Sequence, residues 1–192
     1  NINMIYISGG KYKKRKIEVE TNIVRPTSSS KRESIFSILE SFAIKSSLEI
    51  YNNKCFVDLF AGTGALGIEA ISRGGSIAYF YEINNQVYKT LIKNCNTICK
   101  SNEFYIYKKD VTQIKKIEIT LPCSAIFLDP PYKFDNFDKI FDIILQSNIL
   151  EKDTVLIIET DINKNLNLAN KFKIINEKIY GITKILFLKK LD

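Results

Sequence analysis

The chain has 192 residues, which suits one domain or one domain with a small appendage. It contains no histidine and carries a formal net charge of +7, with 45% hydrophobic and 26% charged residues. The absence of histidine excludes Ser-His-Asp and Cys-His nucleophilic machinery, most zinc sites and the commonest general base. The positive charge suggests an anionic partner.

The excess charge is concentrated near the N-terminus. Residues 1–32 hold eight basic and two acidic side chains, whereas the other 160 residues hold 20 basic and 19 acidic ones. Charges scattered for solubility would not leave the rest of the chain so close to neutral. The distribution therefore favours a phosphate-facing surface in the N-terminal segment.

The sequence also indicates a compartment. No apolar run approaches the roughly 18 residues of a membrane span, and we find no signal-peptide core, so we expect a cytoplasmic protein. The four cysteines form no CxxC pair, and most lie in or beside apolar segments, as small buried hydrophobes do. Without histidine or further cysteines beside Cys95 and Cys99, we expect no metal site.

The first predicted element is a short basic hairpin. Its strands are residues 5–8 and 16–20, on either side of a pair of glycines. We expect residues 1–27 to form this hairpin extension and residues 28–192 to form the main domain.

A helix is predicted after the extension. Pro26 interrupts regular structure, because the residue before a proline is pushed out of helical conformation. Ser30 and Glu33 then have the spacing of a capping box, which predicts the start of the helix. The apolar residues behind them are spaced for one helical face: Ile35, Ile38, Leu39 and Phe42.

From residue 55 onward, strands and helices alternate. The predicted strands are residues 55–60, 77–81, 104–107, 124–128 and 154–159. The first predicted helix begins after a glycine-rich turn and ends at about residue 72. Further helices are predicted over residues 85–100, 136–146 and 164–170. Two final strands, 172–180 and 182–188, should pair antiparallel because only a tight turn at Gly181 separates them. The pattern predicts an α/β, Rossmann-like fold whose mostly parallel sheet is covered by helices on both faces.

A G-x-G-x-x-G segment stands between the first strand of this domain and its helix. Its glycines allow close approach of a ligand, and Glu82 at the end of the next strand can accept hydrogen bonds from ribose hydroxyls. Asp58 favours S-adenosyl-L-methionine over NAD, because a carboxylate there attracts a cationic amino-acid end and repels a pyrophosphate. Asp110, at the end of the third strand, can accept from an adenine amino group. The predicted cofactor-binding residues are Asp58, Phe60, Ala61, Gly62, Gly64, Glu82, Asp110 and Val111.

Asp129-Pro130-Pro131-Tyr132 ends the fourth strand of the domain. Two successive prolines lack N–H donors and have fixed φ, so they present carbonyl oxygens from a rigid loop. Asp129 and the Pro130 carbonyl can accept both hydrogens of an exocyclic amino group, while Tyr132 stacks on an unpaired base. We predict these four residues to be catalytic, in an in-line transfer of a methyl group from sulfonium to nitrogen.

Together these motifs resemble the bacterial 16S ribosomal RNA (guanine(966)-N(2))-methyltransferases, a class I methyltransferase family, nearly end to end. The resemblance is carried by residues 7–16, 25–36, 58–74 and 129–132. It implies a seven-stranded sheet with a reversed last strand, S-adenosyl-L-methionine as cofactor and guanine as the target base. It also leads us to expect the family's chains to begin at Met4.

The resemblance implies 16S rRNA as partner, free or within an assembling small ribosomal subunit. We expect a monomer without a membrane or metal partner. The predicted RNA-binding residues come from the basic N-terminal segment: Lys11, Lys13, Lys14, Arg15, Lys16, Arg25, Thr27 and Arg32.

Three alternatives remain open at this stage. The Asp-Pro-Pro-Tyr motif also serves adenine-N6 methylation of DNA, although 192 residues leave no room for a separate target-recognition domain. A non-catalytic RNA-binding assembly factor would not need an intact glycine loop together with Asp129 and Tyr132. An NAD enzyme would need a proton-transfer residue beside the nicotinamide, and none is visible.

Overall fold

The computed structural model describes residues 2–20, 22–23 and 27–192. The elements in these residues are, in chain order, β1 (Ile2–Tyr6), β2 (Lys16–Glu20), α1 (Ser29–Ser46), β3 (Cys55–Asp58), α2 (Ala65–Arg73), β4 (Ile77–Tyr81), α3 (Asn85–Ile98), β5 (Phe104–Tyr107), β6 (Cys123–Leu128), α4 (Phe137–Gln146), β7 (Val155–Asp161), β8 (Phe172–Tyr180) and β9 (Thr183–Lys190).

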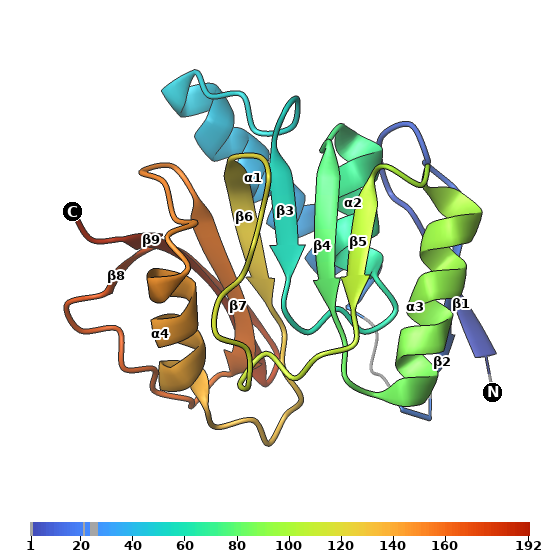
Figure 1. Cartoon of the computed structure of the whole chain (residues 1–192). Helices are drawn as coiled ribbons and strands as arrows, with labels where there is room; N and C mark the ends of the chain where they lie inside the picture. Colours follow the sequence, from blue (N-terminus) through green and yellow to red (C-terminus); the bar gives the residue numbers. More distant parts are fainter. Residues whose placement is uncertain (1, 21, 24–26) are drawn as a thin grey trace.

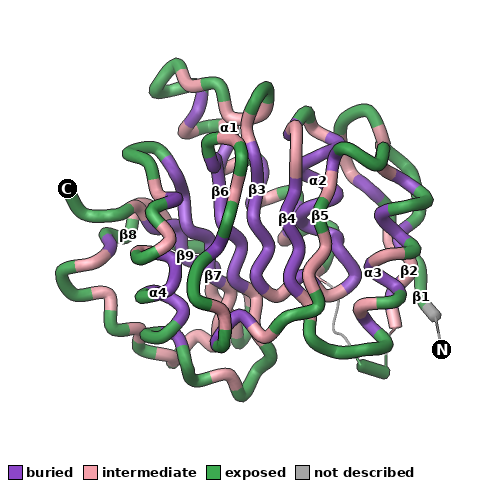
Figure 2. Tube along the Cα trace, in the orientation of Figure 1, coloured by how far each residue is buried: buried purple, intermediate pink, exposed green. Residues whose placement is uncertain are grey.

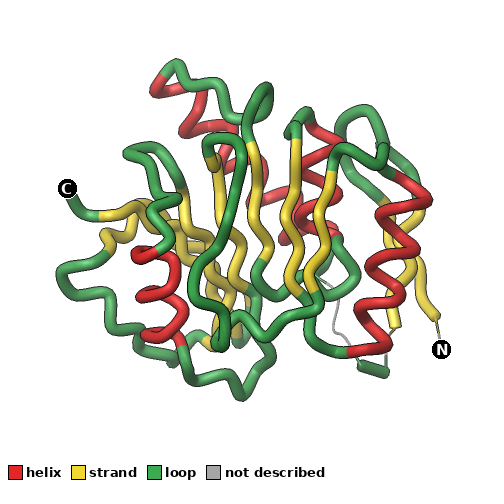
Figure 3. The backbone as a smooth tube through the Cα atoms, in the orientation of Figure 1, coloured by secondary structure: helices red, strands yellow, loops and turns green. Residues whose placement is uncertain are grey.

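The centre of the molecule is a seven-stranded sheet in the order β5-β4-β3-β6-β7-β9-β8 (Figure 3). Strands β3 to β7 are mutually parallel, and β9 lies antiparallel to both of its neighbours, β7 and β8. The predicted α/β fold with a reversed last strand is therefore confirmed. Because the five parallel strands share one direction, their carboxyl ends meet at the lower edge of the sheet in Figure 1.

Helices cover both faces of the sheet, with α4 in front and α1 and α2 behind it in Figure 1. Helix α4 contributes Phe141 and other apolar residues to the core on its face, whereas Phe36 of α1 packs behind the sheet with its ring centroid 5.9 Å from that of Phe127. The central strands are buried throughout in Figure 2. Coverage on both faces explains why every residue of β3 and β6 is buried, with no alternation between buried and exposed positions.

Several predicted boundaries differ from the observed ones by one to three residues, and one predicted helix is wrong. The first hairpin strand ends at Tyr6 and not at residue 8. Helix α1 is capped by the side chain of Ser28, whose oxygen accepts from the Lys31 backbone N–H at 3.2 Å, so the predicted capping box at Ser30 does not form. Residues 164–168 are irregular and residues 169–170 form a turn, so the helix predicted over residues 164–170 is absent.

The composition of that last segment accounts for the error. Its leucines, Leu166 and Leu168, both pack against the core cluster around α4, yet their spacing of two does not match a helical face. Asparagines flank them, and asparagine side chains compete for backbone hydrogen bonds in non-helical conformations. The two leucines, at a spacing typical of a strand, therefore anchor a loop to the core in this segment.

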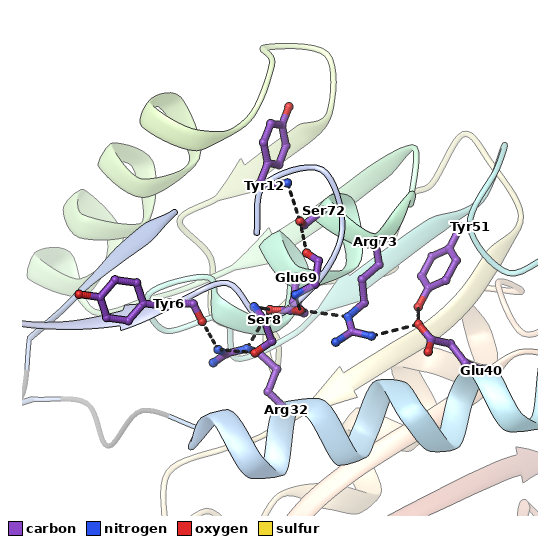
Figure 4. Close-up of polar contacts among 10 residues, drawn as sticks. Tyr6, Ser8, Tyr12, Arg32, Glu40, Tyr51, Glu69, Ser72 and Arg73 are labelled. Atoms are coloured by element: carbon purple, nitrogen blue, oxygen red, sulfur yellow. Dashed lines mark hydrogen bonds and ion pairs between the residues drawn. The ribbon is translucent and has the colours of Figure 1, made fainter. Parts of the chain in front are cut away.

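The β1–β2 hairpin is tied to the body through the carboxylate of Glu69 on α2 (Figure 4). Glu69 accepts from the backbone N–H groups of Ser8 and Gly9 at 3.0 and 2.9 Å. It also accepts from Nε of Arg32 and Nε of Arg73, each at 3.0 Å. One carboxylate thus receives four donors from the hairpin loop, α1 and α2, which fixes the position of the hairpin against the body.

This network corrects the prediction for Arg32. Its side chain is fully buried, as is that of Glu69, and its guanidinium also donates to the Tyr6 carbonyl. A buried guanidinium held by a carboxylate cannot reach a phosphate, so Arg32 is a structural residue and not an RNA-binding one. Within the described residues, no helix is long and apolar enough to cross a membrane.

Candidate active site

A cavity of about 780 Å³ opens at the carboxyl edge of the sheet. Each parallel strand, or the loop just beyond it, contributes at least one acidic residue to the lining: Asp58, Glu82, Asp110, Asp129, Glu159 and Asp161. All four predicted catalytic residues and seven of the eight predicted cofactor residues line this cavity, the exception being Gly64. The topology therefore brings both predicted groups together at the position where open α/β sheets bind ligands.

The glycine loop and Glu82 are held to each other. The Gly62 backbone N–H donates to Oε2 of Glu82 at 2.9 Å, and the Asn84 N–H donates to Oε1 at 2.8 Å. These bonds orient the carboxylate at the cavity wall. Each oxygen retains acceptor capacity, because a carboxylate offers about four lone-pair sites. The residue thus has the placement to accept hydrogen bonds from a pair of ribose hydroxyls.

Two glycines in this region are required by close packing. Gly64 adopts φ 91° at the start of α2, and a Cβ there would lie 2.7 Å from Cδ1 of Leu91. A Cβ on Gly67 would lie 2.3 Å from Cε1 of Phe80, so α2 can approach β4 only where the side chain is absent. Gly64 therefore shapes the turn from behind the cavity wall.

Asp58 is the most deeply buried carboxylate in the cavity. Its Oδ1 is buried and has no hydrogen-bond partner among the described residues. Burial, together with the nearby charges of Asp129 and Glu82, holds its pKa well above the usual range. A buried carboxyl oxygen without a partner needs a donor, and a cationic ligand group would supply one.

Asp110 and Val111 also line the cavity. Asp110 uses Oδ1 to accept from the Thr112 backbone N–H at 2.9 Å and from its hydroxyl at 2.7 Å. Val111 is buried and faces the cavity as an apolar surface. This combination of one fixed acceptor and an apolar wall suits a purine ring that carries an amino group.

Asp129 lies at the end of β6, where Oδ2 accepts from the Thr27 hydroxyl at 3.2 Å. Burial and the negative charge of Glu159 raise its pKa to about 7, against the lowering effects of the Thr27 hydrogen bond and Lys31. Thr27, predicted to bind RNA, is placed in the cavity wall beside this carboxylate. In its ionised form Asp129 accepts hydrogen bonds from an amino group.

The rest of the motif forms a fixed turn with an exposed aromatic ring. The Phe134 N–H donates to the Pro131 carbonyl at 2.9 Å, which closes the loop after the two prolines. The Phe134 ring packs edge-on against Phe60 at 5.0 Å and forms an apolar wall. Tyr132 is 77% exposed at the mouth of the cavity, where its ring face is free to stack on a base.

A second polar group in the cavity was missed by the sequence analysis. Lys31 of α1 pairs with Oε1 of Glu159 on β7 and donates to the Thr183 hydroxyl at 3.0 Å. These residues are far apart in sequence, and no local motif marks them. Only the alignment of strand ends, with Asp129 and Glu159 in adjacent positions, could have suggested Glu159.

Five more of the predicted RNA-binding residues lie on the hairpin, outside the cavity. Lys13, Lys14, Arg15 and Lys16 are exposed, with the Arg15 guanidinium donating to the Thr97 carbonyl at 2.6 Å. Lys11 pairs with Glu103, so part of its charge is already neutralised. Arg25 lies outside the described residues. The structure thus leaves an exposed basic loop on the hairpin and a largely acidic cavity at the sheet edge.

This arrangement defines a class of protein. A Rossmann-like sheet with a reversed last strand carries a glycine loop, an acidic residue after β4 and an Asp-Pro-Pro-Tyr loop after β6, all in one cavity. An excess of carboxyl groups around the glycine loop suits a cationic ligand better than the pyrophosphate of a dinucleotide, which disfavours the NAD alternative. The chain has the fold and the site of a class I methyltransferase.

Comparison with known proteins gives the family. The family described as "Conserved hypothetical protein 95" matches residues 5–189. Ribosomal RNA small subunit methyltransferase D from Buchnera aphidicola subsp. Acyrthosiphon pisum is 32% identical, with 91% of this chain and 87% of that protein covered. The protein of the same name from Haemophilus influenzae is 28% identical, with 93% and 90% covered. The solved structure named "Putative methyltransferase yhhF from Escherichia coli" superimposes with a TM-score of 0.78 at 25% identity over 98% of each chain.

The chain therefore belongs to the ribosomal RNA small subunit methyltransferase D family. The resemblance noted in the sequence is confirmed, and so is the prediction of an enzyme that transfers methyl groups to ribosomal RNA. The roles of individual cavity residues stay predictions.

Proposed function

We propose that this protein transfers a methyl group from S-adenosyl-L-methionine to the exocyclic N2 amino group of a guanine in 16S rRNA. The observation that carries the proposal is the meeting, in one cavity, of Asp58, whose Oδ1 has no partner among the described residues, and the Asp129-Pro130 acceptors. The first suits a cationic donor and the second suits an amino nucleophile. Family membership supplies the class of RNA and the guanine target.

The residues present fit the methyl donor. Asp58 would accept from its amino-acid end, Glu82 would accept from its ribose hydroxyls, and Asp110 would accept from its adenine amino group. When bound, S-adenosyl-L-methionine would supply an electrophilic methyl group on a sulfonium; the sulfur would leave as a neutral thioether, and the methylated nitrogen would release one proton to water. The protein then has no need of a strong base, and this agrees with a chain that contains no histidine.

The chain's own contribution is to hold the amino nitrogen in line. Asp129 and the Pro130 carbonyl accept the two amino hydrogens, which fixes the nitrogen and directs its lone pair toward the methyl group. Tyr132 stacks on the base and holds it outside the RNA helix, a contact worth about 1–3 kcal/mol. Orientation of this kind accounts for a large part of catalysis in group transfer. Residues 1–27 act as an RNA-docking extension of the domain formed by residues 28–192.

The test is transfer of labelled methyl groups to unmodified small-subunit rRNA, free and in assembled particles, followed by nucleoside mass spectrometry. N2-methylguanosine is expected. N6-methyladenosine would instead identify an adenine methyltransferase, and the absence of any transfer would favour the non-catalytic assembly factor.

A substitution at Asp129 distinguishes the part of the cavity proposed to hold the target base from the part proposed to hold the cofactor. Asp129→Ala is expected to abolish transfer while leaving the affinity for S-adenosyl-L-methionine nearly unchanged, as measured by calorimetry. Asp135→Ala, which alters an exposed carboxylate beside the same loop, should retain activity. A large loss of cofactor affinity in Asp129→Ala would place Asp129 in the cofactor half instead.

A further inference from the structure

The carboxyl ends of β6 and β7 present two carboxylates side by side. Leu128 pairs with Ile158 in the parallel register, so the residues that follow them, Asp129 and Glu159, occupy matching positions on adjacent strands. Neighbouring strands lie about 4.8 Å apart, and matching positions face the same side of the sheet. Both side chains line the cavity. The methyl-transfer geometry described above uses Asp129 and leaves Glu159 without a role.

A cation completes this row. Lys31 reaches from the first turn of α1 to Oε1 of Glu159 and donates to the Thr183 hydroxyl at 3.0 Å. Its ammonium also lies 5.8 Å from the centroid of the Tyr180 ring. The side chains of Lys31 and Glu159 are only 16% and 14% exposed, so the pair is held in place at the cavity wall. Along the sheet edge, the order is carboxylate, carboxylate, ammonium.

That order matches one base edge and opposes another. The Watson–Crick edge of guanine presents the N2 amino donor, the N1–H donor and the O6 acceptor in succession. Two acceptors followed by a donor are its complement. Adenine presents an amino donor followed by the N1 acceptor, which would face a carboxylate. An enzyme that placed adenine's amino group on Asp129 would therefore set a lone pair against the charge of Glu159.

We propose that Glu159 and Lys31 are specificity-determining residues that select guanine, Glu159 by accepting from N1–H and Lys31 by donating to O6. This role rests on the proposed function, because it assumes that Asp129 holds the N2 amino group. The Lys31 contact occupies one carboxylate oxygen of Glu159, and a carboxylate has acceptor capacity beyond that. Sites built to hydrogen-bond a substrate group reject analogues that lack it by large factors.

The test compares two RNA substrates that differ only in the atoms that Glu159 and Lys31 would contact. One carries guanine at the target position and the other carries 2-aminopurine, which keeps the N2 amino group but has an acceptor at N1 and lacks O6. The wild-type enzyme is expected to show a kcat/KM at least about tenfold higher for guanine.

Glu159→Gln changes that ratio in a defined direction. The Gln side-chain oxygen would turn to Lys31, which leaves its NH2 group toward the base. An NH2 donor opposes guanine N1–H and suits the N1 acceptor of 2-aminopurine, so the ratio is expected to fall to about one or to invert. Lys31→Met should also shrink the ratio, because the donor to O6 is lost. Glu177→Gln on exposed β8 is the matched control and should keep the wild-type ratio.

The possible failures are distinguishable. If the wild-type enzyme methylates guanine N2 but Glu159→Gln and Lys31→Met both keep its ratio, the specificity role is wrong and the proposed function stands. Equal losses on both substrates would likewise make the pair structural. If the wild-type enzyme transfers no methyl group to either N2, the proposed function itself fails. Thermal melting of each variant identifies any that does not fold, and the other variant then decides.

Discussion

Asp129 is subject to opposing influences at the edge of the sheet. Burial and the charge of Glu159 raise its pKa to about 7, while the Thr27 hydroxyl and Lys31 favour the ionised form. An acceptor for an amino group must be ionised to offer all its lone pairs. The carboxylate that the reaction needs is therefore one that the fold holds near its point of titration.

A pH dependence follows from this position. Below pH of about 7 the Asp129 carboxyl becomes protonated and loses acceptor capacity, so kcat/KM should fall about tenfold for each further pH unit. The measurement is the rate of methyl transfer at limiting RNA between pH 5.5 and 9. The concentration of S-adenosyl-L-methionine is kept the same at every pH. A rate that stays flat down to pH 5.5 would show that the ionised form is not required.

Asp129 should also reduce the stability of the fold. Its pKa is raised on folding from an ordinary value near 4, so between about pH 4 and 7 the unfolded chain releases a proton that the folded chain retains. Stability is therefore lost as the pH rises through this window. Asp129→Asn removes the charge, and we expect it to stabilise the fold by about 1 kcal/mol or more at pH 8 and by little at pH 4.

Urea unfolding of wild type and Asp129→Asn at the two pH values measures this difference. The same variant should be inactive, so the residue would be one whose function is maintained at a cost in stability. A variant that is less stable than wild type at pH 8 would contradict the idea that the ionised carboxylate is strained by its surroundings.

At the scale of elements, α1 joins two sites with different tasks. Lys31 points to the cavity, where it meets Glu159, whereas Arg32 enters the network that binds the hairpin. Successive residues on a helix lie about 100° apart, so adjacent basic residues reach different neighbours. One helix turn thus connects the candidate guanine pocket to the hairpin.

The network around Glu69 should dominate the stability of that connection. Glu69→Gln is expected to destabilise the protein by about 3–5 kcal/mol, because it leaves the buried Arg32 guanidinium without a compensating charge. Glu118→Gln is the matched control, since Glu118 pairs with Lys116 on the exposed surface and should change stability by less than about 0.5 kcal/mol. If the two variants lost the same free energy of unfolding in urea, the buried network around Glu69 would not be a major source of stability.

Elements with long apolar runs were predictable, and elements fixed by distant contacts were not. The strands β3 and β6 can be predicted from the sequence because both faces of each are buried, so most of their residues are apolar. The loop at residues 164–170 was mistaken for a helix because its leucines are fixed by the core around α4. Likewise, Asp129 follows from a local motif, but Lys31 and Glu159 meet only through the packing of α1 across the sheet edge.

For the molecule as a whole, the net charge of +7 conceals two surfaces of opposite charge, an acidic cavity and a basic hairpin loop. The cavity is lined by six acidic residues and two lysines: Asp58, Glu82, Asp110, Asp129, Glu159, Asp161, Lys31 and Lys109. Several of the N-terminal basic side chains are already paired within the body, which sequence counting could not show. What remains exposed is the hairpin loop, a smaller patch than residues 1–32 suggested.

The last prediction concerns this loop. Neutralising Lys13, Lys14 and Arg15 together should weaken RNA binding and flatten its dependence on salt, since each lost phosphate contact lowers the slope of log K against log salt by about 0.7–0.9. Lys11 should contribute less than its neighbours, because Glu103 already pairs with it. The measurement is the affinity for small-subunit rRNA across a series of salt concentrations.

A matched control distinguishes the effect of the hairpin's position from the effect of a change in net charge. Neutralising three exposed lysines at the other end of the sheet, Lys173, Lys178 and Lys190, changes the net charge by the same amount. If the hairpin is the docking surface, only the hairpin variant should show a reduced salt slope, because counterion release follows direct phosphate contacts. Equal slopes in the two variants would mean that RNA senses only the overall charge, and an unchanged slope in the hairpin variant would make that loop a solvated surface.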